Sequence, residues 1–176
     1  MEELRKLHLQ IQNFVEIWKV VDGYENYKVS SLGRVKNVKT GRILKGSDRG
    51  NGYLTVVLYK NKKAKTFNVH QLIGKAFLVN PENKRCIDHK DRDRKNNKVS
   101  NLRYATLQEN NLNKSKYKNN KSGHIGVIWD KKRKSWKAYI RIDGKLKHLG
   151  YFDDITIAVQ SRKAAVKKYH GEFAPK

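Results

Sequence analysis

One segment limits the fold of this chain more than any other: residues 114–121 read KSKYKNNK. The segment contains four lysines, two asparagines and no aliphatic side chain, so it has nothing to bury in a hydrophobic core. We therefore expect the chain to divide here, with residues 114–122 acting as a basic linker. A plain solvated loop is an equally good interpretation. In a protein that binds nucleic acid, Lys116 and Lys118 would instead lie along the phosphates.

The charge of the chain restricts its partners. Lys and Arg number 40 and Asp and Glu 16 among 176 residues, which gives a formal net charge of +24. A compact fold with this charge repels itself unless a polyanion lies nearby, so we expect nucleic acid to bind. Aromatic residues interleaved with the cations favour nucleic acid over an anionic membrane surface. No apolar run approaches the roughly 18 residues of a membrane span.

The apolar content favours small units. A hydrophobic fraction of 38% is low for one large core, and suits several units that complete their stability on binding. Cys86 is the only cysteine, which excludes an internal disulfide and a cysteine-rich zinc site and indicates a reducing compartment. Residues 1–15 lack the features of a secretory signal, and we expect them to form a tail.

The N-terminal part is predicted to be a small antiparallel β meander followed by one helix. Short β-prone runs such as YKVS and YLTVVLY lie between turn signals. These signals are DG at 22–23, SSLG at 30–33, TG at 40–41 and RGNG at 49–52. Residues 68–78, NVHQLIGKAFL, place apolar residues at helical spacing after a possible asparagine cap.

The C-terminal part is predicted to be three strands packed on one helix. Residues 126–152 contain two aromatic-rich runs joined by a basic turn, then the Asp143-Gly144 hairpin signal and a third run. A helix follows, capped by Asp153 or Asp154 and ended by Gly171. Period-two alternation separates the middle strand into two faces. Trp136, Ala138 and Ile140 should pack on the helix, and Lys137, Tyr139 and Arg141 should project away from it.

Residues 86–113, CIDHKDRDRKNNKVSNLRYATLQENNLN, place an aspartate and a histidine within a basic chain. We predict two strands, an intervening polar loop and a helix. Thr106 and Glu109 match a capping box, so the helix should begin at Leu107 with Asn110 on its first turn. This arrangement can bring Asp88 near Asn110, and their oxygen atoms suit magnesium or manganese better than zinc.

The neighbouring residues suit phosphodiester hydrolysis. A neutral His89 could take a proton from an attacking water, while the metal stabilises charge on the phosphate and the departing 3′ oxygen. Asn101 could hold the loop or the imidazole by hydrogen bonds without touching the metal. A lone Asp-His pair, or asparagines in loops, would indicate only turns, so the prediction depends on the ordered set.

This ordered set resembles the ββα-metal core of HNH endonucleases, in the variant where asparagine replaces the last histidine. The spacings of 13 residues from Asp88 to Asn101 and 9 from Asn101 to Asn110 are similar to those of phage and intron-encoded homing enzymes. The resemblance covers residues 81–113. It implies metal ligation by Asp88 and Asn110, general-base action by His89 and positioning of the hairpin by Asn101.

Residues 16–80 resemble the nuclease-associated modular motif found ahead of HNH cores in homing endonucleases. The matching stretches are EIWKVVDGYENYKVSSLGRVKN, GRILK, GY and VHQLIGKAF. Its core is predicted to include Trp18, Tyr24, Tyr27, Val29 and Val35. Arg34 and Lys36, together with Lys39, Arg42 and Lys45, are candidate phosphate contacts, with a solvated face as the alternative. His70 is predicted to be a helix residue that supports the nuclease core.

Residues 123–176 resemble the APETALA2-type DNA-binding domain. The matching residues are GV at 126–127, W-x-A-x-I at 136–140, LGYF at 149–152 and a helix that ends in GEFA. That family places its sheet in the major groove, which implies DNA contacts by Lys137, Tyr139, Arg141 and His148. Ile128 and Asp130 stand where the plant pattern has arginines, so the base specificity of the family does not transfer.

These features predict an α+β chain in which an HNH core lies between an N-terminal β module and a C-terminal sheet module. The predicted function is a site-specific DNA endonuclease of the homing type that uses one Mg²⁺ or Mn²⁺ and no structural zinc. We expect a monomer that nicks one strand of double-stranded DNA, in the cytoplasm of a bacterial host infected by a phage. The alternatives are a DNA-binding transcription regulator with an inactive core, and a nuclease that acts on RNA or without specificity.

Overall fold

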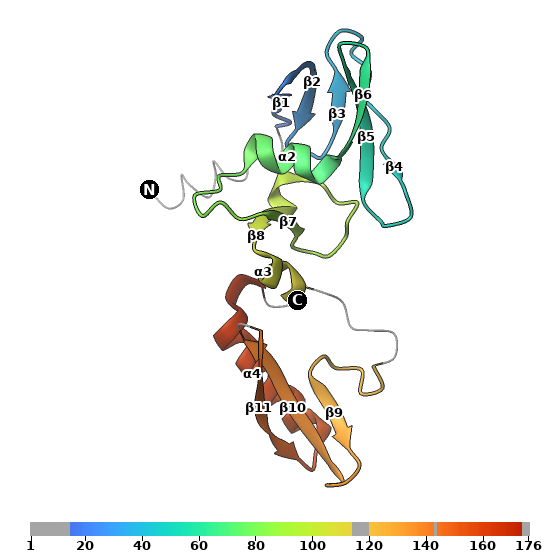
Figure 1. Ribbon diagram of the computed structural model, residues 1–176. Coiled ribbons are helices and arrows are strands. Elements are labelled where there is room, and N and C mark those ends of the chain that lie inside the picture. Colours follow the sequence, from blue (N-terminus) through green and yellow to red (C-terminus); the bar gives the residue numbers. More distant parts are fainter. Residues whose placement is uncertain (1–14, 114–119, 143, 174–176) are drawn as a thin grey trace. The chain divides into compact units, whose positions relative to one another are not determined.

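The computed structural model describes residues 15–113, 120–142 and 144–173 (Figure 1). The described residues form two compact units, one ending at Ala105 and the other starting at Thr106. The positions of the parts relative to one another are not determined. Both units combine antiparallel strands with helices, so the predicted α+β class is confirmed. No helix in the described ranges combines the length and the apolar character needed to cross a membrane.

The first unit contains two three-stranded sheets and a two-stranded hairpin. The first sheet comprises β1 (Trp18–Val21), β2 (Tyr24–Ser30) and β3 (Val35–Asn37). The second sheet comprises β4 (Ser47–Asp48), β5 (Leu54–Lys60) and β6 (Lys63–Asn68). The hairpin consists of β7 (Cys86–His89) and β8 (Leu102–Ala105). The prediction of a single meander is therefore wrong. Strand β5 pairs along its length with β6, through a tight turn in which Asn61 and Lys62 have positive φ.

Helix α2 (Val69–Phe77) lies where the predicted helix was placed, and it packs against strands of both sheets and of the hairpin (Figure 1). Asn68 occupies its N-cap position, but the side chain makes no capping hydrogen bond. The buried core is a single cluster formed by Val21, Tyr27, Val29, Val35, Val56, Leu58, Val69, Leu72, Ile73 and Leu102. Because Leu102 of β8 belongs to this cluster, the hairpin shares a core with the N-terminal sheets. The predicted module boundary at residue 80 therefore separates residues that share one core. The predicted module boundaries stay predictions.

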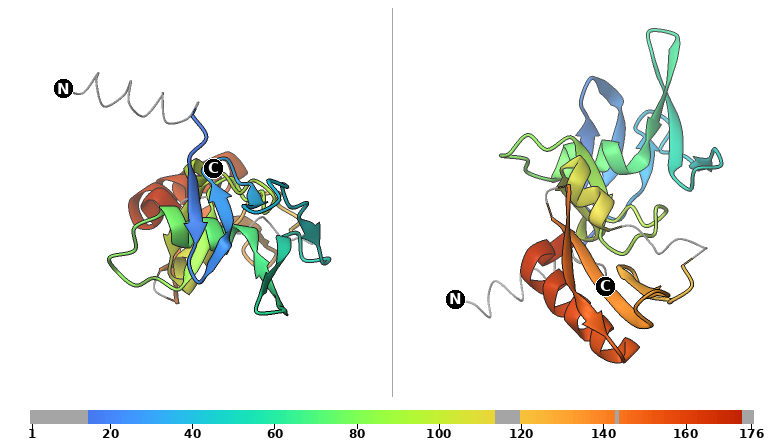
Figure 2. Two further views of the ribbon diagram at one scale, coloured as in Figure 1. Left: turned by 90° about the horizontal axis from the view of Figure 1, so that it is seen from above. Right: turned by 60° about the horizontal axis from the view of Figure 1, so that its bottom comes forward.

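The second unit begins with α3 (Leu107–Leu112) and continues into a sheet of order β11-β10-β9. Its strands are β9 (Val127–Asp130), β10 (Ser135–Ile142) and β11 (Lys145–Phe152), followed by α4 (Ile155–His170) and the short 3₁₀ helix η2 (Gly171–Phe173). Figure 2 shows α4 along one face of the sheet, where Val127, Ala138 and Ala158 form a buried cluster. The predicted strands and helix are confirmed. Asp154 caps α4 through the N–H of Thr156, and Gly171 ends it.

Candidate active site

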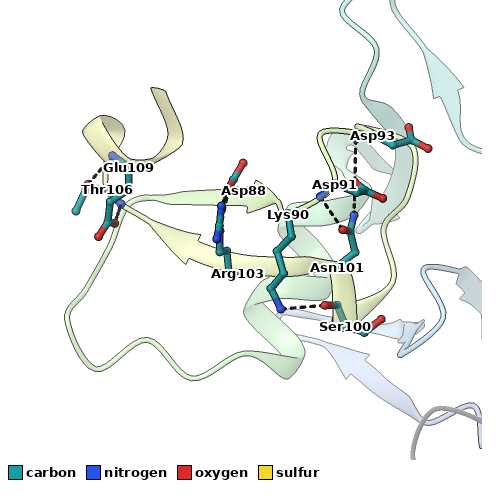
Figure 3. A network of polar contacts seen from close by, with 9 residues as sticks. All are labelled: Asp88, Lys90, Asp91, Asp93, Ser100, Asn101, Arg103, Thr106 and Glu109. Carbon is teal, nitrogen blue, oxygen red and sulfur yellow. Dashed lines mark hydrogen bonds and ion pairs between the residues drawn. The ribbon is translucent and has the colours of Figure 1, made fainter. Parts of the chain in front are cut away.

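The hairpin of β7 and β8 places Asp88 directly opposite Arg103. The side chains of directly opposite residues lie on the same face of a sheet, so the two can pair. Asp88 is buried, and its Oδ2 accepts hydrogen bonds from Nε and Nη2 of Arg103 at 2.9 and 2.7 Å (Figure 3). These charge-assisted bonds fix the orientation of the carboxylate and compensate its charge.

His89 follows Asp88 in β7, and it is also buried, with 4% of the residue exposed. Its Nε2 lies 3.0 Å from Oδ1 of the buried Asn97. An amide oxygen only accepts hydrogen bonds, so Nε2 of His89 is the donor in this contact. Sequence reasoning gave Asn97 no role. The adjacent asparagines 96 and 97 were the available signal, but asparagines in loops more often serve turns.

Two further rings lie against His89. The ring centroid of His70 on α2 is 5.0 Å from that of His89, and the Tyr53 ring is 4.8 Å from His70 and 5.9 Å from His89. Burial, and then the nearby His89, lower the pKa of His70 from 6.5 to about 4. His70 is therefore neutral near pH 7. Its placement agrees with the predicted supporting position, whereas Tyr53 was not predicted to be near the site.

Asn101 ends the 3₁₀ helix η1 (Val99–Asn101) just before β8, and it braces the loop that connects the two hairpin strands. Its Nδ2 donates to Asp91 Oδ1 at 2.9 Å and to the carbonyl of Asn96 at 2.8 Å, and its Oδ1 accepts from the N–H of Asp91 at 3.1 Å (Figure 3). Burial alone would raise the pKa of Asp91, but hydrogen bonds from Asn96, Asn101 and Asp93 together lower it. Asn101 was predicted to hold either the loop or the imidazole, and the hydrogen bonds described here hold the loop.

Asn110 lies on α3, in the second unit. The predicted capping box is present: Thr106 Oγ1 accepts from the N–H of Glu109 at 3.1 Å, and Glu109 Oε2 accepts from the N–H of Thr106 at 2.7 Å (Figure 3). The helix begins at Leu107 as predicted, which puts Asn110 in its first turn. Asn110 and Asp88 therefore belong to different units.

The donors that sequence reasoning assigned to a metal are both oxygen atoms. Among the residues that the structure describes, no three His, Cys, Asp or Glu side chains gather as a metal-binding group. One carboxylate and one amide oxygen, completed by water and phosphate oxygen, fit a hard ion such as Mg²⁺. They do not fit zinc, which takes nitrogen and sulfur ligands in closed tetrahedral sites.

The candidate DNA contacts of the second unit share one face of its sheet. Lys137 lies opposite Tyr151, and Tyr139 opposite His148, in the register of β10 and β11. Ala138 and Ile140 are buried as predicted, and Trp136 packs against the buried cluster under α4. Arg141 and His148 are exposed, whereas Lys137 and Tyr139 are half-buried. Lys116 and Lys118 lie outside the described residues.

Arg34 and Lys36 lie over the ring of Trp18, with cationic groups 5.6 and 4.0 Å from its centroid. Trp18 is half-buried beneath them, and Arg34 is also paired with Glu16. Part of the charge of Arg34 is thus compensated within the chain. Tyr27, Val29 and Val35 are buried as predicted, and Tyr24 packs against them.

Comparison with known proteins agrees with this geometry. The NUMOD4 motif matches residues 16–59, and a family model described as HNH endonuclease matches residues 68–112. The DNA endonuclease I-HmuI of Bacillus phage SP01 is 36% identical over 119 residues, which cover 65% of this chain and 68% of that protein. The chain belongs to the HNH endonuclease family. The residues matched by the HNH endonuclease model span the positions of Asp88, His89, Asn101 and Asn110, whose roles stay predictions.

Other HNH relatives come from viruses. An uncharacterized HNH endonuclease of Acanthamoeba polyphaga mimivirus is 40% identical over 93 residues, which are 53% of this chain but only 28% of that protein. The H-N-H endonuclease F-TflII of Escherichia phage T5 is 29% identical over 106 residues, covering 59% of this chain and 53% of that one. A solved structure, described as DNA binding and cleavage by the HNH homing endonuclease I-HmuI, covers 86% of this chain and 88% of its own, with a TM-score of 0.52 and 28% identity.

Membership in the HNH family confirms the predicted enzyme class, an endonuclease and therefore a hydrolase of phosphodiester bonds. HNH endonucleases generally depend on a divalent metal ion. The two matching family models cover residues 16–59 and 68–112. The APETALA2-type resemblance of residues 123–176 accordingly stays a prediction.

Proposed function

We propose that this HNH endonuclease is a site-specific DNA endonuclease of the homing type. In this proposal Asp88 and Asn110 hold one divalent metal ion and His89 is the general base. The observation that supports it most directly is the buried pair Asp88 and His89, each held by a hydrogen-bonding partner, Arg103 and Asn97. Buried polar groups held in a single orientation are what proton transfer and metal binding require.

The residues of the chain carry the proton transfer. Nδ1 of His89 takes a proton from a water molecule while the oxygen of that water forms a bond to phosphorus. The bond from phosphorus to the 3′ oxygen breaks in the same step. A bound Mg²⁺ or Mn²⁺ supplies Lewis-acid stabilisation of negative charge on the phosphate and the departing oxygen. Asn97 orients the imidazole, Arg103 orients the carboxylate and Asn101 keeps the intervening loop in shape.

Double-stranded DNA is the proposed substrate. The phage relative is named a DNA endonuclease, and the formal net charge of +24 suits a long phosphate backbone. In an APETALA2-type second unit, the sheet face with Lys137, Tyr139, Arg141 and His148 would enter the major groove. Arg34 and Lys36 are proposed phosphate contacts of the first unit, and Lys116 and Lys118 of the basic linker.

One catalytic histidine per chain supports nicking of one strand by a monomer. The metal ion, Mg²⁺ or Mn²⁺, would bind once per active site without any structural zinc. Viral relatives support an origin in a phage, and we propose that the enzyme acts in the cytoplasm of an infected bacterium.

The decisive experiment is incubation of the protein with Mg²⁺ and host DNA, including the locus that lacks its gene, with nick positions mapped on both strands. We expect nicks at one preferred site on one strand. His89→Ala should lose the nicking, by about 100-fold or more for a general base, and should keep salt-sensitive DNA binding. Equal cutting by His89→Ala would contradict the mechanism. Preference for RNA over duplex DNA in a competition assay would contradict the proposed substrate.

A further inference from the structure

The residue Tyr53 lies outside the segment that matches the HNH endonuclease model, yet it contacts the catalytic histidine. It belongs to the NUMOD4 match, and its ring centroid lies 5.9 Å from that of His89 and 4.8 Å from that of His70. We propose that Tyr53 is a positioning residue for the general base: its ring, with that of His70, holds the imidazole of His89 in the plane needed for proton transfer. This inference rests on the proposed function of His89.

The packing of Tyr53 does not explain its presence. The hydrophobic core of the first unit includes Leu54 among its partly buried members, but Tyr53 is not among them. Its described contacts are the two histidine rings and the guanidinium of Arg94, 4.7 Å from the ring centroid. A half-buried aromatic side chain that contacts a catalytic ring instead of the core suits a role in the site.

The backbone around Tyr53 is held rigidly enough for this role. Oδ1 of Asp48 accepts hydrogen bonds from the N–H groups of Gly50 and Gly52, both at 2.9 Å, and Asn51 Oδ1 accepts from the N–H of Tyr53 at 3.1 Å. The side chain of Asp48 also pairs with Lys95, at 3.4 Å. The turn before β5 is therefore fixed to the loop that connects β7 and β8.

Arg94 from that same loop makes a second link. Its Nη1 donates to the carbonyl of Asn51 at 2.7 Å. Gly52 has a φ of +83°, and a Cβ added there would lie 3.3 Å from Cδ of Arg94. A larger residue at 52 would be strained and would crowd this arginine. The turn, the arginine and the rings thus form one support for the histidine.

The described contacts of the His89 imidazole act on one ring atom and on the ring plane. Asn97 accepts the hydrogen bond of Nε2 at 3.0 Å. The Tyr53 and His70 rings meet the imidazole at interplanar angles of 41° and 60° and limit its tilt. A misplacement of about 1 Å in a reacting group can cost on the order of 100-fold in rate, so the ring contacts are expected to matter for kcat.

The test compares Tyr53→Leu, Tyr53→Phe and the control Tyr59→Leu, whose tyrosine is 58% exposed on β5. For Tyr53→Leu we expect kcat for nicking to fall by about 10- to 100-fold, with KM and metal-free DNA affinity within about twofold of wild type. Tyr53→Phe keeps the ring and should recover most of the rate. Tyr59→Leu should match the wild type.

Three outcomes would overturn the inference. They are a wild-type rate for Tyr53→Leu, a Tyr53→Phe enzyme as slow as Tyr53→Leu, and a loss of DNA affinity that accounts for the loss of rate. The last would make Tyr53 a DNA contact instead.

A second readout does not depend on cleavage. The carbon-bound ring protons of His89, identified by the loss of their NMR signals in His89→Ala, should shift and broaden in Tyr53→Leu and shift little in Tyr53→Phe. An unchanged His89 signal in Tyr53→Leu would overturn the inference even if the leucine variant were less stable. If the wild type does not cleave DNA with Mg²⁺ or Mn²⁺, the proposed function fails while this readout still tests the placement of Tyr53.

Discussion

Single buried amides and imidazoles carry much of the organisation of this site. Asn101 is 8% exposed and joins η1 to both ends of the connecting loop, through Asp91 and Asn96. His70 is 6% exposed, and its Nδ1 is buried without a hydrogen-bond partner in the structure. The buried amide of Asn101 is compensated by its hydrogen bonds, whereas burying Nδ1 of His70 costs free energy because it makes no hydrogen bond in the structure.

We expect Asn101→Ala to destabilise the first unit by about 2–4 kcal/mol, because it removes three hydrogen bonds that a buried side chain makes. The measurement is urea unfolding near pH 7. Ser100→Ala is the matched control, since the side chain of the neighbouring Ser100 is exposed and its backbone carbonyl is what Lys90 contacts. Equal stability of the two variants would contradict the bracing role.

The lowered pKa of His70 predicts a loss of stability in acid. Its folded-state pKa is about 4 and its ordinary value is 6.5, so the unfolded chain binds the extra proton as the pH falls below 6.5. The difference of about 2.5 corresponds to roughly 3 kcal/mol, lost progressively between pH 6.5 and 4. His70→Phe cannot take up a proton and should show a flatter curve in urea unfolding across this range. A slope equal to the wild type would refute the assignment.

At the scale of elements, the packing of α2 on the hairpin decides where strand β7, which carries Asp88 and His89, lies. Gly74 of α2 faces Ile87 of β7, and a Cβ added at Gly74 would lie only 2.3 Å from Cδ1 of Ile87. Ile87 immediately precedes Asp88 and His89 in that strand. The helix can therefore approach the strand only because residue 74 has no side chain.

Gly74→Ala should destabilise the fold by about 1–3 kcal/mol through overpacking, although alanine is favoured over glycine by about 1 kcal/mol in a helix. Ile87→Val removes the crowded Cδ1, so the double variant should recover part of that loss. The measurement is the free energy of unfolding of both single variants and the double variant. Additive effects would show that Gly74 and Ile87 do not interact in this way.

At the scale of the whole molecule, the charge should set how the affinity for DNA depends on salt. We expect affinity to fall steeply with salt, and each lost phosphate contact to reduce the slope of log K against log salt by about 0.9. The double variant Lys137→Ala with Arg141→Ala should reduce both affinity and slope. Lys167→Ala with Lys168→Ala on α4 is the matched control, since each pair lowers the net charge from +24 to +22, that is 24 less 2. Equal losses in the two double variants would exclude the β10 face as a specific contact.

Local sequence determined the elements and the chemistry of this protein. The capping box, a motif of four residues from Thr106 to Glu109, specifies the start of α3. The alternation along β10 specifies which side chains turn away from α4. Asp88, His89, Asn101 and Asn110 were predicted as site residues because the residue types that metal-dependent hydrolysis needs occur in order along one short segment. These signals depend on neighbours in the chain, so one sequence is enough to find them.

Tertiary structure decided what depends on residues far apart in the chain. The cluster that joins Leu102 to Val29 and the approach of Gly74 to Ile87 both depend on packing between distant segments. The same holds for the rings of Tyr53 and His70 beside His89. The sequence therefore predicted His89 as the general base, whereas only the folded chain determined which residues contact it.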